Sequence, residues 1–395
     1  MKRNKICTII AYALFVAASL CQSGTLMQTF LSEIGFSSGQ IYVHSSIVQA
    51  TSMITILLLS RWADGKNIIF KVTLSLVLSG ALFFGYLPLC FQVSNNKTAF
   101  LLLLTVSILQ ALTLALHTIC DYKLPYYLFK PQEYGAVLAV CGIISSALTF
   151  VIGIIISALS NNIPYANIML IAFIVSGIML ILAGIMRGLS RPLFDISDLP
   201  ENTAKIPISK TIRHPAFLQL FLPHLLRGYA FGVTCVIAVV SNELGFSAAA
   251  TTATVPIMAL STILSCTAFG IFSNRISYRR LIIIGSLCFI PLPLILFNNS
   301  TPLFLAVYAI LIFGRNFIDN AVPTALIYIV PSEIAGPYNA LRLALHFSGI
   351  VISNLLATLI SVKALLISAL AVQLICALCF RFAKVMKDAT PKSLV

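Results

Sequence analysis

Residues 164–186 read PYANIMLIAFIVSGIMLILAGIM and contain no charged side chain. A helix of about 20 apolar residues is long enough to cross the roughly 30 Å hydrocarbon core of a bilayer. Comparable stretches recur along the 395-residue chain, near 6–30, 40–60, 68–92, 98–120 and 135–159 before this one, and near 215–240, 248–273, 278–297, 302–329, 337–361 and 364–383 after it. We therefore predict an all-α membrane protein with twelve transmembrane helices in two six-helix halves.

The composition leads to the same conclusion. The chain is 59% hydrophobic and 9% charged, whereas soluble domains carry about 25% charged residues. A soluble fold of this size could not cover so much apolar surface with so few charges. The lipid bilayer is thus the expected surrounding of the chain.

The basic residues indicate an orientation in the membrane. They collect in alternate loops, and the loops of the other side hold only Lys97 and Lys363. Because such a bias marks the cytoplasmic side, we predict a multi-pass protein of the cell membrane with both termini in the cytoplasm. The lack of a sizeable soluble domain favours a bacterial inner membrane. The formal net charge of +14 is explained by this loop bias, so we expect no nucleic-acid partner.

A polar segment separates two halves of similar length. Residues 187–213 hold Asp195, Asp198 and Glu201 together with three prolines. We interpret residues 1–186 as an N-terminal six-helix bundle, residues 187–213 as a cytoplasmic linker and residues 214–395 as a C-terminal six-helix bundle.

The loops after the second and eighth spans echo each other. Residues 60–67 (SRWADGKN) lie 210 positions before residues 270–277 (GIFSNRIS). Together with the six-plus-six pattern, these loops resemble the G-x-x-x-D-[RK]-x-G-[RK]-[RK] loop of the major facilitator superfamily. Ser60 stands where that pattern has its first Gly, and Asn274 stands where it has Asp.

In that family the loop serves as a cytoplasmic latch between neighbouring helices. The resemblance implies a gating role for Asp64 with Arg61 and Lys66, and for Arg275 and Arg279 in the second copy. Charge-assisted bonds of this kind could break when the two halves rock. Topological anchoring alone remains the alternative.

Ionisable side chains at membrane depth cost about 2.5–3.5 kcal/mol each on insertion scales, so they mark candidate functional sites. Arg227 lies near the middle of the seventh predicted span, and Arg315 lies at a similar depth in the tenth. Asp319 follows Arg315 by four residues, on the same helical face, and can pair with it. His224 precedes Arg227 by about one turn.

The first half offers polar rather than charged residues at this depth. Tyr42 and Gln49 belong to a polar stripe on the second predicted span, while Gln22 and Gln110 lie in the first and fourth. We predict that these four residues bind substrate together with Arg227 and Arg315. Hydrogen bonding between helices is the alternative role for the glutamines.

These features predict a secondary transporter that moves a small solute by alternating access. Two arginines and one acid at membrane depth give a net charge of +1. This net charge favours uptake of an anionic or carboxylate-bearing metabolite. We expect protons as the coupling ion, with Asp319 and His224 as coupling residues, because Asp319 could take a proton whenever Arg315 moves away. Three alternatives remain open: a purely structural Arg315–Asp319 pair, a multidrug or metabolite efflux antiporter, and a non-transporting receptor of the same fold.

Neither an enzyme nor a metal site is expected. The five histidines are scattered and show no H-E-x-x-H spacing. Cys376 and Cys379 form a C-x-x-C pair, but the sequence holds no second pair to complete a metal site. We therefore expect no cofactor, and we expect a small-molecule substrate, protons and bilayer lipid as the partners.

Overall fold

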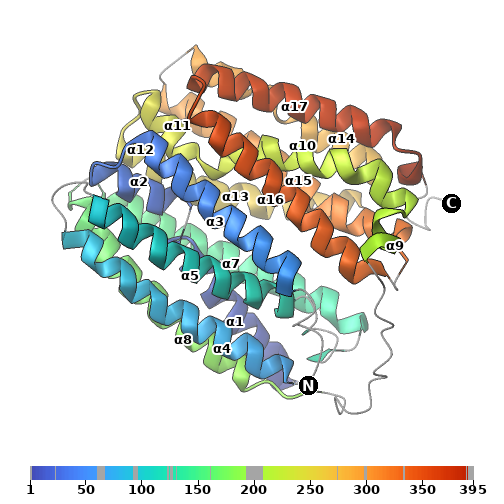
Figure 1. The fold of residues 1–395 in the computed structure, drawn as a ribbon, viewed down its shortest axis with the longest axis horizontal. Helices are drawn as coiled ribbons and strands as arrows, with labels where there is room; N and C mark the ends of the chain where they lie inside the picture. The colour runs from blue at the N-terminus through green and yellow to red at the C-terminus, as the bar shows by residue number, and fades with distance from the viewer. Residues whose placement is uncertain are drawn as a thin grey trace. The chain divides into compact units, whose positions relative to one another are not determined.

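The computed structural model describes residues 2–22, 24–59, 67–91, 97–121, 124, 128–129, 131–160, 162–192, 208–273, 275–297, 300–331, 334–387 and 389. Within these residues every regular element is a helix (Figure 1). The chain divides into two compact units. The first unit comprises Met1–Glu201 and Thr251–Pro256, and the second comprises Asn202–Ala250 and Ile257–Val395.

The first unit is built from the elements before residue 192. They are α1 (Lys2–Ser19), α2 (Thr25–Glu33), α3 (Ser38–Leu59), α4 (Ile68–Phe83), the 3₁₀ helix η1 (Phe84–Phe91), α5 (Lys97–Asp121), α7 (Pro131–Leu159) and α8 (Tyr165–Gly188). Within this unit α4 packs between α8 and α5, α1 packs on α7 and α8, and α3 packs on α5.

The second unit contains most of the remaining elements. They are α9 (Ile208–Ile212), α10 (Pro215–Cys235), α11 (Ile237–Glu243), α12 (Ala248–Thr252), α13 (Thr254–Phe272), α14 (Tyr278–Leu287), η3 (Leu292–Leu296), α15 (Thr301–Ile329), α16 (Ala335–Ala357), α17 (Val362–Phe382) and η5 (Lys384–Lys387). Here α10 packs against α16 and α17, and α14 packs against α15 and α17. The end of α12 and the start of α13 are grouped with the first unit.

Glycines let the helices of each unit approach closely, as is common where helices meet in lipid. In the first unit a Cβ atom built on Gly80 of α4 would lie 2.6 Å from the carbonyl oxygen of Gly177 on α8. In the second unit a Cβ atom on Gly285 of α14 would lie 2.8 Å from the carbonyl oxygen of Gly314 on α15. Any larger side chain at these positions would push the helices apart.

Ten helices of the described residues are long and apolar enough to cross a membrane, or eleven if α10 and α11 form one bent span. Large apolar side chains on them face outward. On α7, for example, Ile143, Val151 and Ile155 are 61%, 51% and 51% exposed. Such an outer surface suits hydrocarbon rather than water, so the predicted class of all-α membrane protein is confirmed.

Several predicted spans are interrupted, and the first and seventh are broken at corresponding places in the two halves. The first, expected near 6–30, ends at Ser19 and resumes as α2 at Thr25; Ser19 turns its hydroxyl back to the carbonyl oxygen of Val16 at 2.8 Å. The seventh, expected near 215–240, bends by 56° between α10 and α11. The expected span limits did not include these breaks. At the second break the residues are apolar, and hydropathy does not register a change of direction; at the first, Gln22 and Gly24 lie between the two helices.

Both units contain the same turn after their broken span. The residues are Glu33-Ile34-Gly35-Phe36-Ser37 after α2 and Glu243-Leu244-Gly245-Phe246-Ser247 after α11. Gly35 and Gly245 have φ values of 89° and 83°. The amide of Phe36 donates to the carbonyl of Leu31 at 2.9 Å, and the amide of Phe246 donates to that of Ser241 at 3.0 Å. This is the Schellman arrangement, in which glycine supplies the left-handed residue.

Candidate functional site

Two helices of the second unit hold the charged cluster that the sequence suggested. On α10, Arg227, Phe231 and Thr234 follow one another at intervals of four and three residues, so they share one face. On α15, Arg315 and Asp319 are separated by about one turn. We call Arg227, Phe231, Arg315 and Asp319 the arginine cluster.

Asp319 is shared by the two arginines. Its Oδ1 atom forms an ion pair with Nη2 of Arg227, and its Oδ2 atom lies 3.7 Å from Nε of Arg315. The sequence correctly placed Arg315 beside Asp319, but it did not show the contact with Arg227. The side chain of Arg227 is 5% exposed, whereas those of Arg315 and Asp319 are 28% and 33% exposed. Arg227 is therefore the buried member of the group and Asp319 is the accessible one.

The ring of Phe231 supports both guanidinium groups. The Cζ atoms of Arg227 and Arg315 each lie 5.1 Å from the centre of this ring, within the range of a cation–π interaction. Phe231 itself stacks on Phe289 and meets the edge of His346. Through this packing the ring is held in place, and both arginines are oriented toward Asp319.

Arg315 has a further polar contact that fixes its direction. Its Nη1 atom donates a hydrogen bond of 2.8 Å to the hydroxyl of Thr234, a residue buried on α10. The guanidinium therefore spans from α15 to α10 and touches both Thr234 and Asp319. A movement of α10 against α15 would change this contact.

A close helix crossing places Arg227 in the interior. The next residue, Gly228, lies so near the backbone of His346 on α16 that a Cβ atom there would collide with the His346 carbonyl oxygen. On the facing helix, a Cβ atom on Gly349 would likewise collide with the carbonyl of Leu225. Gly228 and Gly232 form the small-x-x-x-small spacing of tight crossings in lipid. The position of Arg227 thus depends on Gly228 and Gly349, the two glycines at which α10 and α16 meet.

Sequence reasoning missed two amides beside the cluster. Asn316 of α15 donates to the hydroxyl of Thr262 at 2.7 Å, and Asn320 donates to the sulfur of Cys266 at 3.6 Å. Each amide follows a charged residue, Arg315 or Asp319, by one position, so the four polar residues form a double stripe with a four-residue period. This period is visible in the sequence and predicts two adjacent polar stripes on α15.

His224 lies one turn before Arg227, and its side chain contacts α16. Its Nε2 atom is 3.3 Å from the hydroxyl of Tyr338 on α16, and the residue is 1% exposed. Arg342, one turn further along α16, donates to Asn339 at 3.3 Å. His224 and Arg342 therefore continue a buried polar strip along α10 and α16. A coupling role for His224 stays a prediction.

The four polar residues expected from the first half lie on α3, on α5 and just after α1. Tyr42 and Gln110 are buried, and Gln110 donates to the carbonyl of Ser79 at 3.5 Å. Gln22 and Gln49 are half-buried. The first unit also contains a buried network that we did not predict: Ser107 lies 2.8 Å from Nε2 of His44 and 2.9 Å from the hydroxyl of Tyr86. A substrate-binding role for these four residues stays a prediction.

The predicted latch is only partly covered by the structure. Arg61, Asp64 and Lys66 lie outside the described residues. Arg275 is exposed, and Arg279 donates to the backbone carbonyl of Arg381 at 3.3 Å, which ties the start of α14 to the end of α17. This contact joins helices of one unit, and a gating role for Arg275 and Arg279 stays a prediction.

A second ion pair lies in the first unit, where none was predicted. Arg187, near the end of α8, bonds through Nη2 to Oδ1 of Asp121 at the end of α5, at 2.7 Å. Its Nη1 atom is 3.3 Å from the hydroxyl of Thr8 on α1. The sequence places Arg187 at the start of the predicted linker, but in the structure its side chain is 6% exposed. It therefore ties three helices together.

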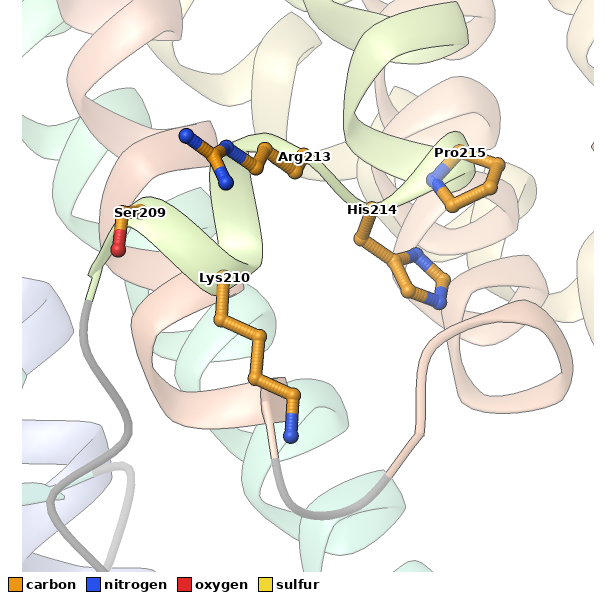
Figure 2. A pocket seen from close by; sticks show the side chains of 5 residues that line it. All are labelled: Ser209, Lys210, Arg213, His214 and Pro215. Atoms are coloured by element: carbon orange, nitrogen blue, oxygen red, sulfur yellow. The ribbon is translucent and has the colours of Figure 1, made fainter.

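A surface pocket opens at the start of α10. It has a volume of about 370 Å³ and is lined by Ser209, Lys210, Arg213, His214 and Pro215 (Figure 2). His214 caps α10 by accepting a hydrogen bond from the amide of Ala216 at 3.3 Å. The side chains of Lys210 and Arg213 point in different directions (Figure 2). Because they do not converge, we assign the candidate site to the arginine cluster rather than to this pocket.

The fold and the cluster together define a polytopic α-helical membrane protein with charged residues in its interior. The family model of the Major Facilitator Superfamily matches residues 7–353. The chain belongs to this superfamily, a family of transporters. The search of curated proteins found no match.

Solved structures of transporters have the same fold. A bacterial homologue of the iron transporter ferroportin in an inward-facing state has a TM-score of 0.71 at 15% identity, covering 97% of this chain and 99% of that one. A bacterial homologue of the human lysosomal transporter Spinster reaches 0.69 at 13% identity, covering 98% of each chain. The nucleoside transporter NupG reaches 0.65 at 15% identity, covering 96% of this chain and 98% of that one. At such identities the likeness concerns the fold alone.

Proposed function

We propose that this protein is a secondary transporter that takes up an anionic or carboxylate-bearing solute by alternating access, with Arg227 and Arg315 binding the anionic group. The observation that carries the proposal is the arginine cluster, in which two guanidinium groups converge on one carboxylate. Counted over its members, the cluster has two positive charges and one negative charge. An arriving anion would therefore meet a net positive charge in a region of low dielectric.

Energetics support a functional role for the cluster. Charged residues at membrane depth are costly, and a buried ion pair often contributes little net stability compared with apolar residues of the same volume. Arginine binds carboxylates with two parallel hydrogen bonds and keeps its charge at every accessible pH. A guanidinium such as Arg227, which is buried and supported by an aromatic ring, is suited to recognise an anion.

Asp319 is the proposed site of proton coupling. Its carboxylate is one-third exposed and contacts both arginines, so its protonation would weaken two ion pairs at once. Asp319→Asn should then abolish proton-driven uptake and preserve exchange of substrate for substrate. Loss of both activities in a folded variant would contradict this role.

A thermal-shift screen of the purified protein tests the anion proposal. We expect a carboxylate or phosphate among a set of metabolites and drugs to raise the unfolding temperature of the parent protein and to lose this effect in Arg227→Ala. Arg275→Ala removes an equal charge from an exposed position and is the matched control. Selective stabilisation by lipophilic cations would contradict the proposal and favour the efflux alternative.

A further inference from the structure

The position at which an anion would bind Arg227 is already occupied by the carboxylate of Asp319. Asp319 uses one oxygen for Arg227 and the other for Arg315. A second carboxylate could reach the same donors only by standing beside Asp319, where two negative charges would repel each other, or by replacing it. Replacement is the arrangement that the geometry favours.

The members of the cluster differ in how firmly they are held. Arg227 is buried, rests on Phe231 and is followed by the glycine at the α10–α16 crossing. Arg315 is held by Thr234. Asp319 is the most exposed of the three and has a short side chain. It is therefore the member that can leave while both arginines stay in place.

We infer that the substrate carboxylate replaces the carboxylate of Asp319 between Arg227 and Arg315. Asp319 takes up one proton and moves away from the two arginines as a neutral acid. This inference rests on the proposed function. The proton bonds to an Asp319 oxygen on the side from which the substrate enters, and it is released to water on the other side when the Arg227–Asp319 pair forms again. One proton then moves with each singly charged anion.

The net charge of the cluster is the same before and after this exchange. In the empty state, two arginines and ionised Asp319 give a sum of +1. With a singly charged substrate bound and Asp319 protonated, the sum is again +1. If Asp319 stayed ionised, the loaded state would have a sum of zero, and the two states would differ in charge during reorientation. Replacement with protonation therefore predicts a transport cycle that moves no net charge.

Other titratable or charged groups lie near the cluster or next to its residues along α15. They are Tyr308 on α15, His224 on α10, Cys235 at its end, Arg342 and His346 on α16, Cys376 on α17, Cys266 on α13 and Cys288 after α14. Among the described groups at this site Asp319 is the one acid. The histidines are the competing proton carriers, and the experiment must separate them from Asp319.

Proton uptake on binding is the direct test. Acetate, lactate and benzoate are each added to the purified full-length protein in weakly buffered solution, and bound anion and absorbed protons are measured. We expect one proton per anion bound, and an apparent Kd that rises tenfold per pH unit once Asp319 is ionised in the empty state. Anion binding without proton uptake would overturn the inference and leave the proposed function standing. Failure of all three anions, and of the carboxylates from the screen, to bind would instead refute the proposed function.

Variants identify the group that takes the proton. Asp319→Asn should bind the anion with a Kd independent of pH and with no proton uptake. Glu243→Gln removes an exposed acid of the second unit and should behave like the parent protein. His346→Gln should keep the full proton uptake. Loss of the uptake in His346→Gln, or in His224→Gln at the other predicted coupling residue, would overturn the assignment to Asp319.

A transport measurement on the parent protein needs no variant. In proteoliposomes, uptake of the anion that binds should respond to a pH gradient and should not change when a potassium diffusion potential is imposed with valinomycin. Uptake that rises or falls with the imposed potential would overturn the electroneutral cycle.

Discussion

Gly228 allows a prediction about how the arginine cluster is positioned. In Gly228→Ala the new methyl group would collide with the carbonyl of His346, so α10 and α16 must separate. Overpacking of this kind costs about 1–3 kcal/mol. For units of roughly 200 residues, about 2 kcal/mol corresponds to a fall in unfolding temperature of about 4–8 °C. Because Arg227 precedes this glycine, the Arg227–Asp319 pair should also loosen, and anion binding should weaken.

The assay is thermal unfolding of the purified protein, followed by anion binding at a temperature where both proteins remain folded. Gly142→Ala is the matched control, since Gly142 is also inside a helix but a Cβ atom there would have nothing within 4 Å. Alanine is favoured over glycine in helices by up to about 1 kcal/mol, so this control should be neutral or slightly stabilised. A Gly228→Ala variant as stable as Gly142→Ala would refute the reasoning that the crossing depends on glycine.

Two further predictions concern the Arg187–Asp121 ion pair of the first unit and the repeated turns. Arg187→Gln should lower the unfolding free energy by about 3 kcal/mol, because a buried charge partner is lost; the double variant with Asp121→Asn should recover part of that loss, and strict additivity in chemical denaturation would argue against a direct interaction. Gly35→Ala and Gly245→Ala should each cost about 1–2 kcal/mol, because both residues have positive φ, and a thermal unfolding temperature equal to that of the parent protein would exclude strain at these turns.

Hydropathy was sufficient for the class of fold and for the approximate limits of the spans. The apolar stretch at 164–186 became α8 (Tyr165–Gly188), and the stretch at 302–329 became α15 (Thr301–Ile329). Hydropathy could not locate the break after Cys235, since it measures partition into lipid and not direction, whereas the break after Ser19 has Gln22 and Gly24 beside it. The repeated E-[IL]-G-F-S turns are also visible in the sequence.

The candidate site was predictable where its residues share one helix. Arg315 and Asp319 are four positions apart, and helix geometry alone brings them together. Arg227 and Asp319 are separated by 92 positions, and their contact depends on how α10 and α15 are arranged. For the same reason, no local pattern could show that Arg187 reaches Asp121. Residue type and depth singled out Arg227, Arg315 and Asp319 as candidates, and identifying which of them pair required the tertiary structure.

The turns at Gly35 and Gly245 are closed by main-chain hydrogen bonds, so their shape does not depend on the surrounding side chains. Each unit can therefore keep this reversal while the side chains around it differ from those of the other unit. The outcome is seen 210 positions before Arg227, where the chain has Ala17, a buried methyl group on α1. The same helix reversal is thus present in both units, while the helix before it has a guanidinium in one unit and a methyl group in the other.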